Sequence, residues 1–162
     1  MLIRLATPAD SEAIWQILEP VIRAGETYAL DRDMSRTDAL AYWLGSDRET
    51  FVALNGNAVA GTYYLRANQV GGGRHVANCG YMVSPRATGR GIARAMCEHS
   101  LQHAKLRGFR AMQFNFVVSS NTRAVAAWKA MGFEVVGRLP GAFAHPGLGF
   151  VDALVMYRSL ID

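Results

Sequence analysis

The sequence predicts a single α/β domain over residues 1–162, built on a mixed β-sheet with helices on both of its faces. Three observations support this fold class. The chain has 162 residues, of which 51% are hydrophobic and 19% charged, which fits one domain with a full core and argues against intrinsic disorder. Short strand-like runs are interleaved with apolar stripes at helical spacing. Strand and helix alternate only in the second half, which predicts a parallel central pair of strands.

The first half is expected to hold two helices between a first strand, over residues 2–6, and a hairpin. Thr7, Pro8 and Asp10 have the pattern of a helix start: a capping hydroxyl, a proline at the first helical position and an acid three residues after the cap. The apolar stripe of this helix consists of Ile14, Ile17, Leu18, Val21 and Ile22, and Gly25 ends it. Ser35 caps a shorter helix that runs through Leu44. The hairpin then covers 51–54 and 58–66.

The second half is expected to alternate between strand and helix. The expected elements are a strand over 75–83 after a glycine turn at 71–73, a helix over 90–106 closed by Gly108, a strand over 110–118, a helix over 121–131, and final strands over 135–136 and 151–157. A connection rich in proline and glycine joins the last two strands.

Charge and composition narrow the function classes. Lys and Arg number 17 against 13 Asp and Glu, for a formal net charge of +4, which suits a small phosphorylated ligand. The chain has no run of basic residues, so we expect no nucleic-acid partner. It has no apolar run of the roughly 18 residues that a membrane span needs and no secretory pattern, so we expect a soluble, cytoplasmic protein. Cys79 and Cys97 lack metal-ligand spacing, so we expect buried thiols and no metal site.

The segment from Val83 to Ala93 is the strongest candidate for a binding site. A strand ends there, a turn with Gly89 and Gly91 follows, and a long helix begins, so backbone N–H groups are available to an anion. Arg86 and Arg90 add positive charge, although two surface arginines beside a glycine turn are the alternative interpretation. The segment has no GxxxxGK[ST], and Arg94 stands at the third glycine of GxGxxG, which argues against a P-loop and a dinucleotide site.

With a second segment downstream, this turn resembles the GCN5-related N-acetyltransferase (GNAT) superfamily. Arg86, Gly89 and Gly91 match its Arg/Gln-x-x-Gly-x-Gly/Ala acetyl-CoA loop. The family's Asn-x-x-Ala…Leu-Gly-Phe segment is matched by Asn121, Ala124, Met131, Gly132 and Phe133. The expected order of elements is similar to the family fold across nearly the whole chain.

The resemblance implies acetyl-CoA as donor and the family's acyl-CoA N-acyltransferase fold, with a sheet splayed between strands 75–83 and 110–118. By position, Met82 and Val83 are expected to contact the pantetheine or thioester. The amides expected to bind the pyrophosphate run from Arg86 through Ala93 and include Gly89, Arg90, Gly91 and Ile92. The family transfers acetyl directly to an amine and often dimerises through its C-terminal strands, so the resemblance is compatible with a homodimer, while the sequence leaves the oligomeric state open.

The resemblance leaves the proton transfers open. Many members carry a Tyr as the acid for the leaving thiolate where this sequence has Trp128, and an indole is no acid at neutral pH. Trp128 is therefore expected to pack under the cofactor. Asn121 is expected to hold the sulfur or pantetheine, to cap its helix, or both, and water is the other proton donor. For the base, Glu26 is the first choice, with a solvated loop carboxylate as the alternative; Asp31, His145 and Asp152 are others.

Two asparagines inside the central strands are candidates for the acceptor site. Asn78 lies on the strand face that also carries Gly80 and Met82, and Asn115 lies opposite the face assigned to Met112, Phe114, Phe116 and Val118. They are expected to meet at the strand gap, or else to be amides satisfied by neighbours. With Asn121, their pattern is similar to the GNAT branch that acetylates proline analogues, where asparagines hold the substrate carboxylate. Tyr28 is a further expected acceptor contact.

Three functions remain open at this point. The first is an N-acetyltransferase that acts on a small amine, an amino or imino acid. The second is a non-catalytic module that binds acyl-CoA, which the missing Tyr at Trp128 favours slightly. The third is a protein or peptide N-terminal acetyltransferase.

Overall fold

A seven-stranded mixed sheet organises the protein in the computed structural model, which describes residues 1–162. The strand order is β1-β2-β3-β4-β5-β7-β6, and every neighbouring pair is antiparallel except β4 and β5, which are parallel. The predicted parallel central pair is thus confirmed. The strands are β1 Leu2–Leu5, β2 Arg48–Asn55, β3 Ala58–Ala67, β4 Val76–Val83, β5 Ala111–Val118, β6 Glu134–His145 and β7 Gly149–Ser159.

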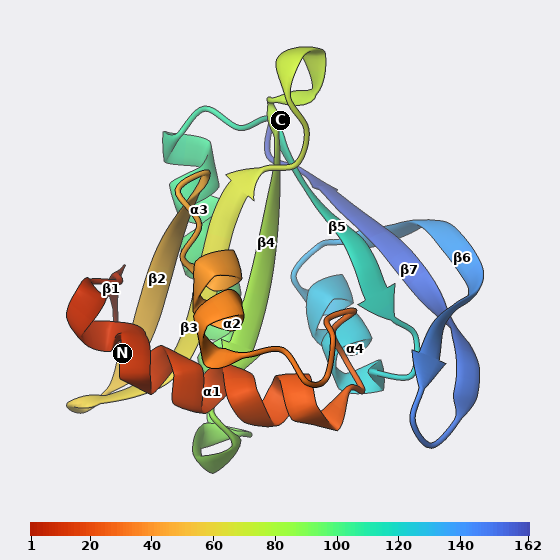
Figure 1. Cartoon of the computed structure of the whole chain (residues 1–162). Helices are drawn as coiled ribbons and strands as arrows, with labels where there is room; N and C mark the ends of the chain where they lie inside the picture. The colour runs from red at the N-terminus through yellow and green to blue at the C-terminus, as the bar shows by residue number, and fades with distance from the viewer.

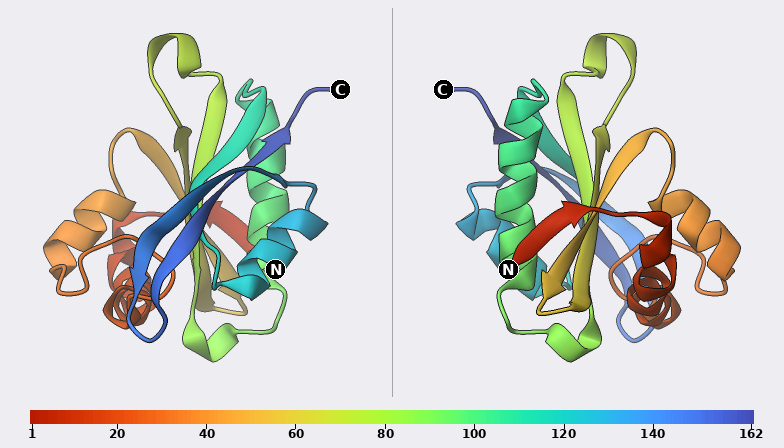
Figure 2. Two further views of the ribbon diagram at one scale, coloured as in Figure 1. Left: turned by 90° about the vertical axis from the view of Figure 1, so that its right-hand side faces the viewer. Right: turned by 90° about the vertical axis from the view of Figure 1, so that its left-hand side faces the viewer.

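Two helices cover each face of the sheet (Figures 1 and 2). On one face lie α1, Ser11–Ala24, and α2, Arg36–Trp43; on the other lie α3, Ile92–Leu106, and α4, Thr122–Ala130. Each side has its own apolar core: one of 10 buried residues under α1 and α2, and one of 21 buried residues under α3 and α4. None of the helices is long and apolar enough to cross a membrane. Cys79 and Cys97 are free and buried, as predicted.

Local sequence signals account for most helix ends. The Ser35 hydroxyl accepts the Asp38 N–H at 3.1 Å, and Gly25 closes α1 with a φ of 64°, a conformation that favours glycine. The Thr7–Asp10 pattern forms a short 3₁₀ turn, Pro8–Asp10, before α1 begins at Ser11. The third helix begins at Ile92 rather than at residue 90, because Gly91 takes a left-handed φ of 74° and caps it.

The sheet separates at its centre. The β4–β5 ladder contains only Val76 with Ala111 and Ala77 with Met112, and the two strands then diverge (Figure 1). At this fork the Asn78 side chain donates a hydrogen bond to the Gln113 carbonyl at 2.9 Å, in place of the next ladder bond. Beyond the fork, residues of β4, of the second half of β5 and of α4 line a common cavity.

Two irregularities were not predicted. A bulge between Phe114 and Val117 shifts β5 against β7, so Val117 joins Met112 and Phe114 in the core. The prediction that Phe116 shares their face was therefore wrong; its ring contacts Phe143 instead. The C-terminal strands are also longer than 135–136 and 151–157, because Pro140 and Gly141 lie inside a register shift of the β6–β7 ladder, and only the turn with Pro146 and Gly147 separates the two strands.

Candidate active site

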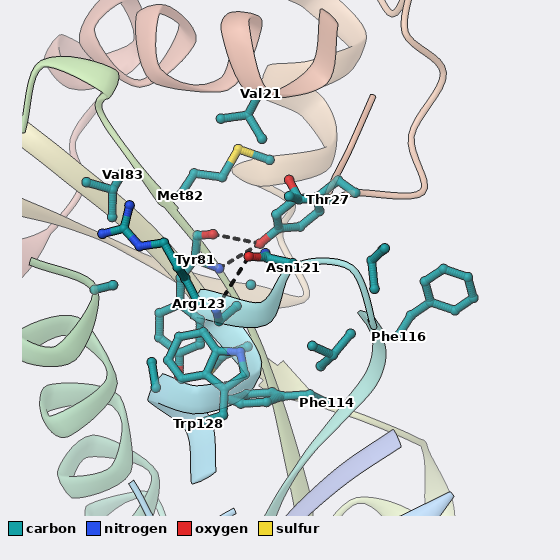
Figure 3. A pocket seen from close by; sticks show the side chains of 18 of the residues that line it. Val21, Thr27, Tyr81, Met82, Val83, Phe114, Phe116, Asn121, Arg123 and Trp128 are labelled. Carbon is teal, nitrogen blue, oxygen red and sulfur yellow. Dashed lines mark hydrogen bonds between the residues drawn. The ribbon is translucent and has the colours of Figure 1, made fainter. Parts of the chain in front are cut away.

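A cavity of about 720 Å³ occupies the gap between β4 and β5 and extends to the start of α3 (Figure 3). The segment between α1 and α2 covers it on one side, and α4 forms its floor. Among the residues proposed from sequence, those that line it are Tyr28, Asn78, Met82, Val83, Gly89, Gly91, Ile92, Ala93, Asn115, Asn121 and Trp128. Glu26, Arg86 and Arg90 are exposed and do not line it, and the other candidate bases, Asp31, His145 and Asp152, do not line it either.

The cationic side chains at this cavity differ from those expected. Arg86 lies in the 3₁₀ turn Pro85–Ala87 and is exposed there, whereas Arg94 and Arg123 line the cavity near the starts of α3 and α4. Arg66 on β3 lines it at the side of Asn78. The lining contains no Asp, Glu, His or Lys, so its charged side chains are all arginines. The alternation of β3 could have indicated Arg66, but only with the strand register known.

The N-terminus of α3 presents free backbone to the cavity. Gly91, the N-cap residue, has no side-chain capping bond, and Gly89 before it has a φ of 81°. A Cβ at either glycine would meet no atom within 4 Å, so the space above both is open. A Cβ at Gly61 on β3 would lie 2.8 Å from Ile92, so this glycine allows α3 to begin close to the sheet. The arrangement suits an anion.

The edge of β4 supplies a second set of backbone groups. The Ser84 N–H donates to the Ala60 carbonyl on β3 at 2.8 Å, so alternation directs the Met82 amide toward β3 as well. The amides of Tyr81 and Val83 then face the gap. The Tyr28 hydroxyl accepts the Tyr81 N–H and donates to the Tyr81 carbonyl, both at 2.8 Å (Figure 3). The Val83 backbone is left facing the cavity, whereas Met82 contributes its side chain.

Burial sets the protonation of the tyrosines around the gap. Burial raises the pKa of Tyr28 well above its usual value, so its hydroxyl stays neutral and acts as a hydrogen-bonding group rather than a base. Burial also raises the pKa of Tyr81, whose hydroxyl lies 2.6 Å from the hydroxyl of Ser100 on α3. Tyr81 therefore contributes its backbone groups to the site, while its ring packs against the core under α3 and α4.

An aromatic floor closes the cavity toward α4. The Trp128 ring lies 5.1 Å from Tyr81 and 5.3 Å from Phe114, centroid to centroid. Trp128 is thus packed in the core, and its expected place under the cofactor stays a prediction. The Asn121 Oδ1 accepts the Ala124 N–H at 3.4 Å and so caps α4, while its Nδ2 makes no hydrogen bond within the protein. That amide group remains available to a ligand.

The two strand asparagines line the same cavity, and their amides are bonded. Asn78 donates to the Gln113 carbonyl, as described above. Asn115 donates to Asn68 Oδ1 at 2.6 Å and accepts from Gln113 Nε2 at 2.9 Å. Each Asn Nδ2 donates one of its two hydrogens in these bonds. The structure thus shows amides bonded to neighbours, each with one donor hydrogen left, at the lining of the cavity, while their role in holding the acceptor stays a prediction.

Comparisons with known proteins point to one family. The model of the acetyltransferase (GNAT) family matches residues 12–133. N-acetyltransferase aca1 of Schizosaccharomyces pombe is 27% identical over 151 residues, covering 83% of this chain and 72% of that protein. A GCN5-related N-acetyltransferase structure from Kribbella flavida is 40% identical, with a TM-score of 0.93 over 98% of this chain and 96% of that one.

A third relative shares the fold with a ligand in place. Phosphinothricin acetyltransferase of Sinorhizobium meliloti, solved in complex with acetyl-CoA, is 24% identical, with a TM-score of 0.86 over 98% of this chain and 87% of that one. The family model covers most of the chain, and it agrees with the splayed sheet and the glycine turn before α3. The chain belongs to the acetyltransferase (GNAT) family and is an acetyl-CoA-dependent acetyltransferase.

Proposed function

We propose that this chain transfers the acetyl group of acetyl-CoA to the amine of a small acceptor, an amino or imino acid. The observation that carries the proposal is the open gap between β4 and β5, which joins the free N-terminus of α3 to the strand asparagines. The acetyl-CoA complex of the Sinorhizobium meliloti relative, with the same fold, supports the donor end.

The residues at the donor end fit acetyl-CoA. In the proposal, the amides from Gly89 to Ala93 bind the pyrophosphate, with Arg94 and Arg123 lining the cavity beside them. The pantetheine arm lies along β4 and bonds the Val83 backbone as an added strand would. Trp128 packs beneath it, and the Asn121 Nδ2 donates to the sulfur or the pantetheine.

The acetyl step forms an N–C bond and breaks a C–S bond. Starting from the protonated amine, the nitrogen loses two protons, one before attack and one as the amide forms, and the thiolate gains one. A typical amine has a pKa near ~10, so it must lose a proton before it attacks. The cavity lining has no carboxylate or imidazole to take this proton, and Glu26 is exposed outside it. In the proposal, water carries both protons away from the nitrogen, with Glu26 acting only through water, and water returns one of them to the sulfur, so one proton is released to solvent.

Contacts on the acceptor side favour a small molecule over a peptide. Tyr28 fastens the α1–α2 segment to β4 through two hydrogen bonds, and Tyr64 lies over Gly80, where a Cβ would be only 2.5 Å from its ring. These contacts hold the α1–α2 segment and the Tyr64 ring close to β4, on the acceptor side of the cavity. Asn78 and Asn115 then provide the amides nearest to the acceptor.

Release of free CoA thiol tests the proposal. Acetyl-CoA is offered with proline, azetidine-2-carboxylate, common amino acids, simple alkylamines and a peptide that begins with alanine. We expect the highest kcat/KM with an amino or imino acid. Binding of acetyl-CoA in calorimetry without turnover of any amine would instead identify a non-catalytic module. Turnover of the peptide alone would identify an N-terminal acetyltransferase.

A further inference from the structure

Arg66 is the cationic side chain at the acceptor end of the cavity. It lies on β3 directly opposite Asn78 of β4 in the strand register, on the face of β3 that carries Tyr64. The other two arginines of the lining, Arg94 and Arg123, belong to α3 and α4 at the donor end. In the proposed function the phosphates of acetyl-CoA attract those two, and Arg94 already pairs with Glu98 at 3.0 Å, but neither explanation applies to Arg66.

The guanidinium of Arg66 has no adequate partner within the protein. It donates no hydrogen bond, its Nε is buried and unpaired, and its nearest carboxylate oxygen is Asp47 Oδ2 at 3.7 Å. That carboxylate already accepts from Arg48 Nε at 2.8 Å and from Arg48 Nη2 at 3.3 Å. Guanidinium donors at least partly removed from water are costly to leave unpaired, so this group is suited to an incoming anion.

A second arginine increases the local positive charge. Arg48 on β2 is directly opposite Arg66, and like charges in that position repel. Its side chain is only 6% exposed, it stacks over Tyr42 and Tyr64 at 4.9 and 4.6 Å, and its Nη1 is also buried without a partner. Asp47 neutralises one of the two cations, so this corner keeps a net charge of about +1.

We propose that Arg66 determines acceptor specificity by binding a carboxylate of the acceptor beside Asn78. This inference rests on the proposed function. Arg66 supplies the positive charge that the side-chain amides of Asn78 and Asn115 lack. A guanidinium presents two parallel N–H donors that match both oxygens of a carboxylate. Arg48 does not line the cavity. It packs over Tyr42 and Tyr64, which do, and it adds positive potential there. The enzyme then selects amines that carry a carboxylate over amines that do not.

The test compares each acid with its neutral amide, for example proline with prolinamide, in the wild type and in Arg66→Met. Met keeps much of the apolar stem and removes the charge. We expect the wild type to prefer the acid by roughly tenfold or more in kcat/KM, as a charge-assisted bond would give. In Arg66→Met this ratio should fall close to one, chiefly through a higher KM for the acid, while kcat/KM for the amide is retained. Arg66→Lys should keep part of the preference.

The control Arg74→Met removes an exposed arginine that precedes β4 and does not line the cavity, and it should leave the ratio unchanged. A wild-type ratio near one would overturn the assignment whether or not the Arg66 variants fold. An unchanged ratio in folded Arg66→Met, checked by thermal unfolding, would also overturn it. In both cases acetyl transfer itself would still be seen. Failure of the proposed function is different: the wild type would then acetylate no amine.

Discussion

The Tyr28 hydroxyl satisfies both backbone groups that Tyr81 turns toward the gap. A ligand that bonds β4 at Tyr81 must therefore displace this hydroxyl, whereas the Val83 backbone needs no displacement. The Tyr28 ring also packs edge-on against Trp43 at 6.1 Å, so the residue links the cover of the cavity to the core under α2. One side chain thus connects the α1–α2 segment, which covers the cavity, to the edge of β4.

Replacing Tyr28 by Phe removes both hydrogen bonds and keeps the ring. The Tyr81 N–H and carbonyl then lose their partner, which should lower the free energy of unfolding by about 1–3 kcal/mol in urea titrations. We expect the acceptor KM to rise several-fold because the cover is released, while the Kd of acetyl-CoA is not weakened. Tyr157→Phe removes a β7 hydroxyl that makes no hydrogen bond and should change none of these values. Equal unfolding free energies for wild type and Tyr28→Phe would contradict the hydrogen-bonding role.

At the scale of elements, the turn before α3 is set by two glycines with positive φ and by Gly61, which allows α3 to begin close to β3. A second helix boundary gives a matched comparison, because Gly108 after α3 has a φ of 85° and open space around it, much like Gly89 with 81°. Only Gly89 lines the cavity.

Gly89→Ala and Gly108→Ala should therefore cost similar stability, about 1 kcal/mol each from the left-handed backbone. Their effects on acetyl-CoA should differ. The methyl group at Gly89 lies where the anion is proposed to approach, so calorimetry should show a Kd raised several-fold to tenfold. Gly108→Ala should bind acetyl-CoA like the wild type. Equal Kd values for the two variants would remove the pyrophosphate from this turn.

The same elements show how far sequence reasoning reaches. Helix ends at Ser35 and Gly25 were predicted because one or two residues decide them locally. The bulge between Phe114 and Val117 was not, because it arises from pairing with β7, a contact distant in the chain. The site follows the same rule. The glycine turn could be predicted, but Arg66 could not, since its place at the cavity depends on the β3–β4 register and on Asp47 being engaged by Arg48.

For the molecule as a whole, the two parts of the sheet are held together by a short parallel ladder. The strands β1 to β4 meet β5, β7 and β6 at two residue pairs, reinforced by the Asn78 bond to Gln113. The gap that would receive a substrate is therefore present in the fold itself. Stability must come from the cores on each face and from the contacts that fasten the outer elements, among them the link between β1 and α1.

That link has a defined dependence on pH. Asp10 is buried and accepts from Arg4 at 2.8 and 3.0 Å and from the Thr7 N–H at 2.7 Å. The Arg4 hydrogen bonds, with those from Thr7, lower the pKa of Asp10 to about 2. A carboxyl whose pKa is lower in the folded state stabilises the fold above its unfolded value, near ~4, and loses this contribution as the pH falls toward about 2.

Asp10→Asn should therefore be less stable than the wild type by about 1–3 kcal/mol at pH 6, and this difference should shrink as the pH approaches 2. Urea midpoints measured across that range provide the test. Asp33→Asn removes an exposed carboxylate that forms no salt bridge, and its effect on stability should stay within about 0.5 kcal/mol throughout. If the unfolding free energies of wild type and Asp10→Asn differ by the same amount at every pH, the carboxylate charge does not hold β1 to α1. Hydrogen-bonding geometry alone would then account for the link.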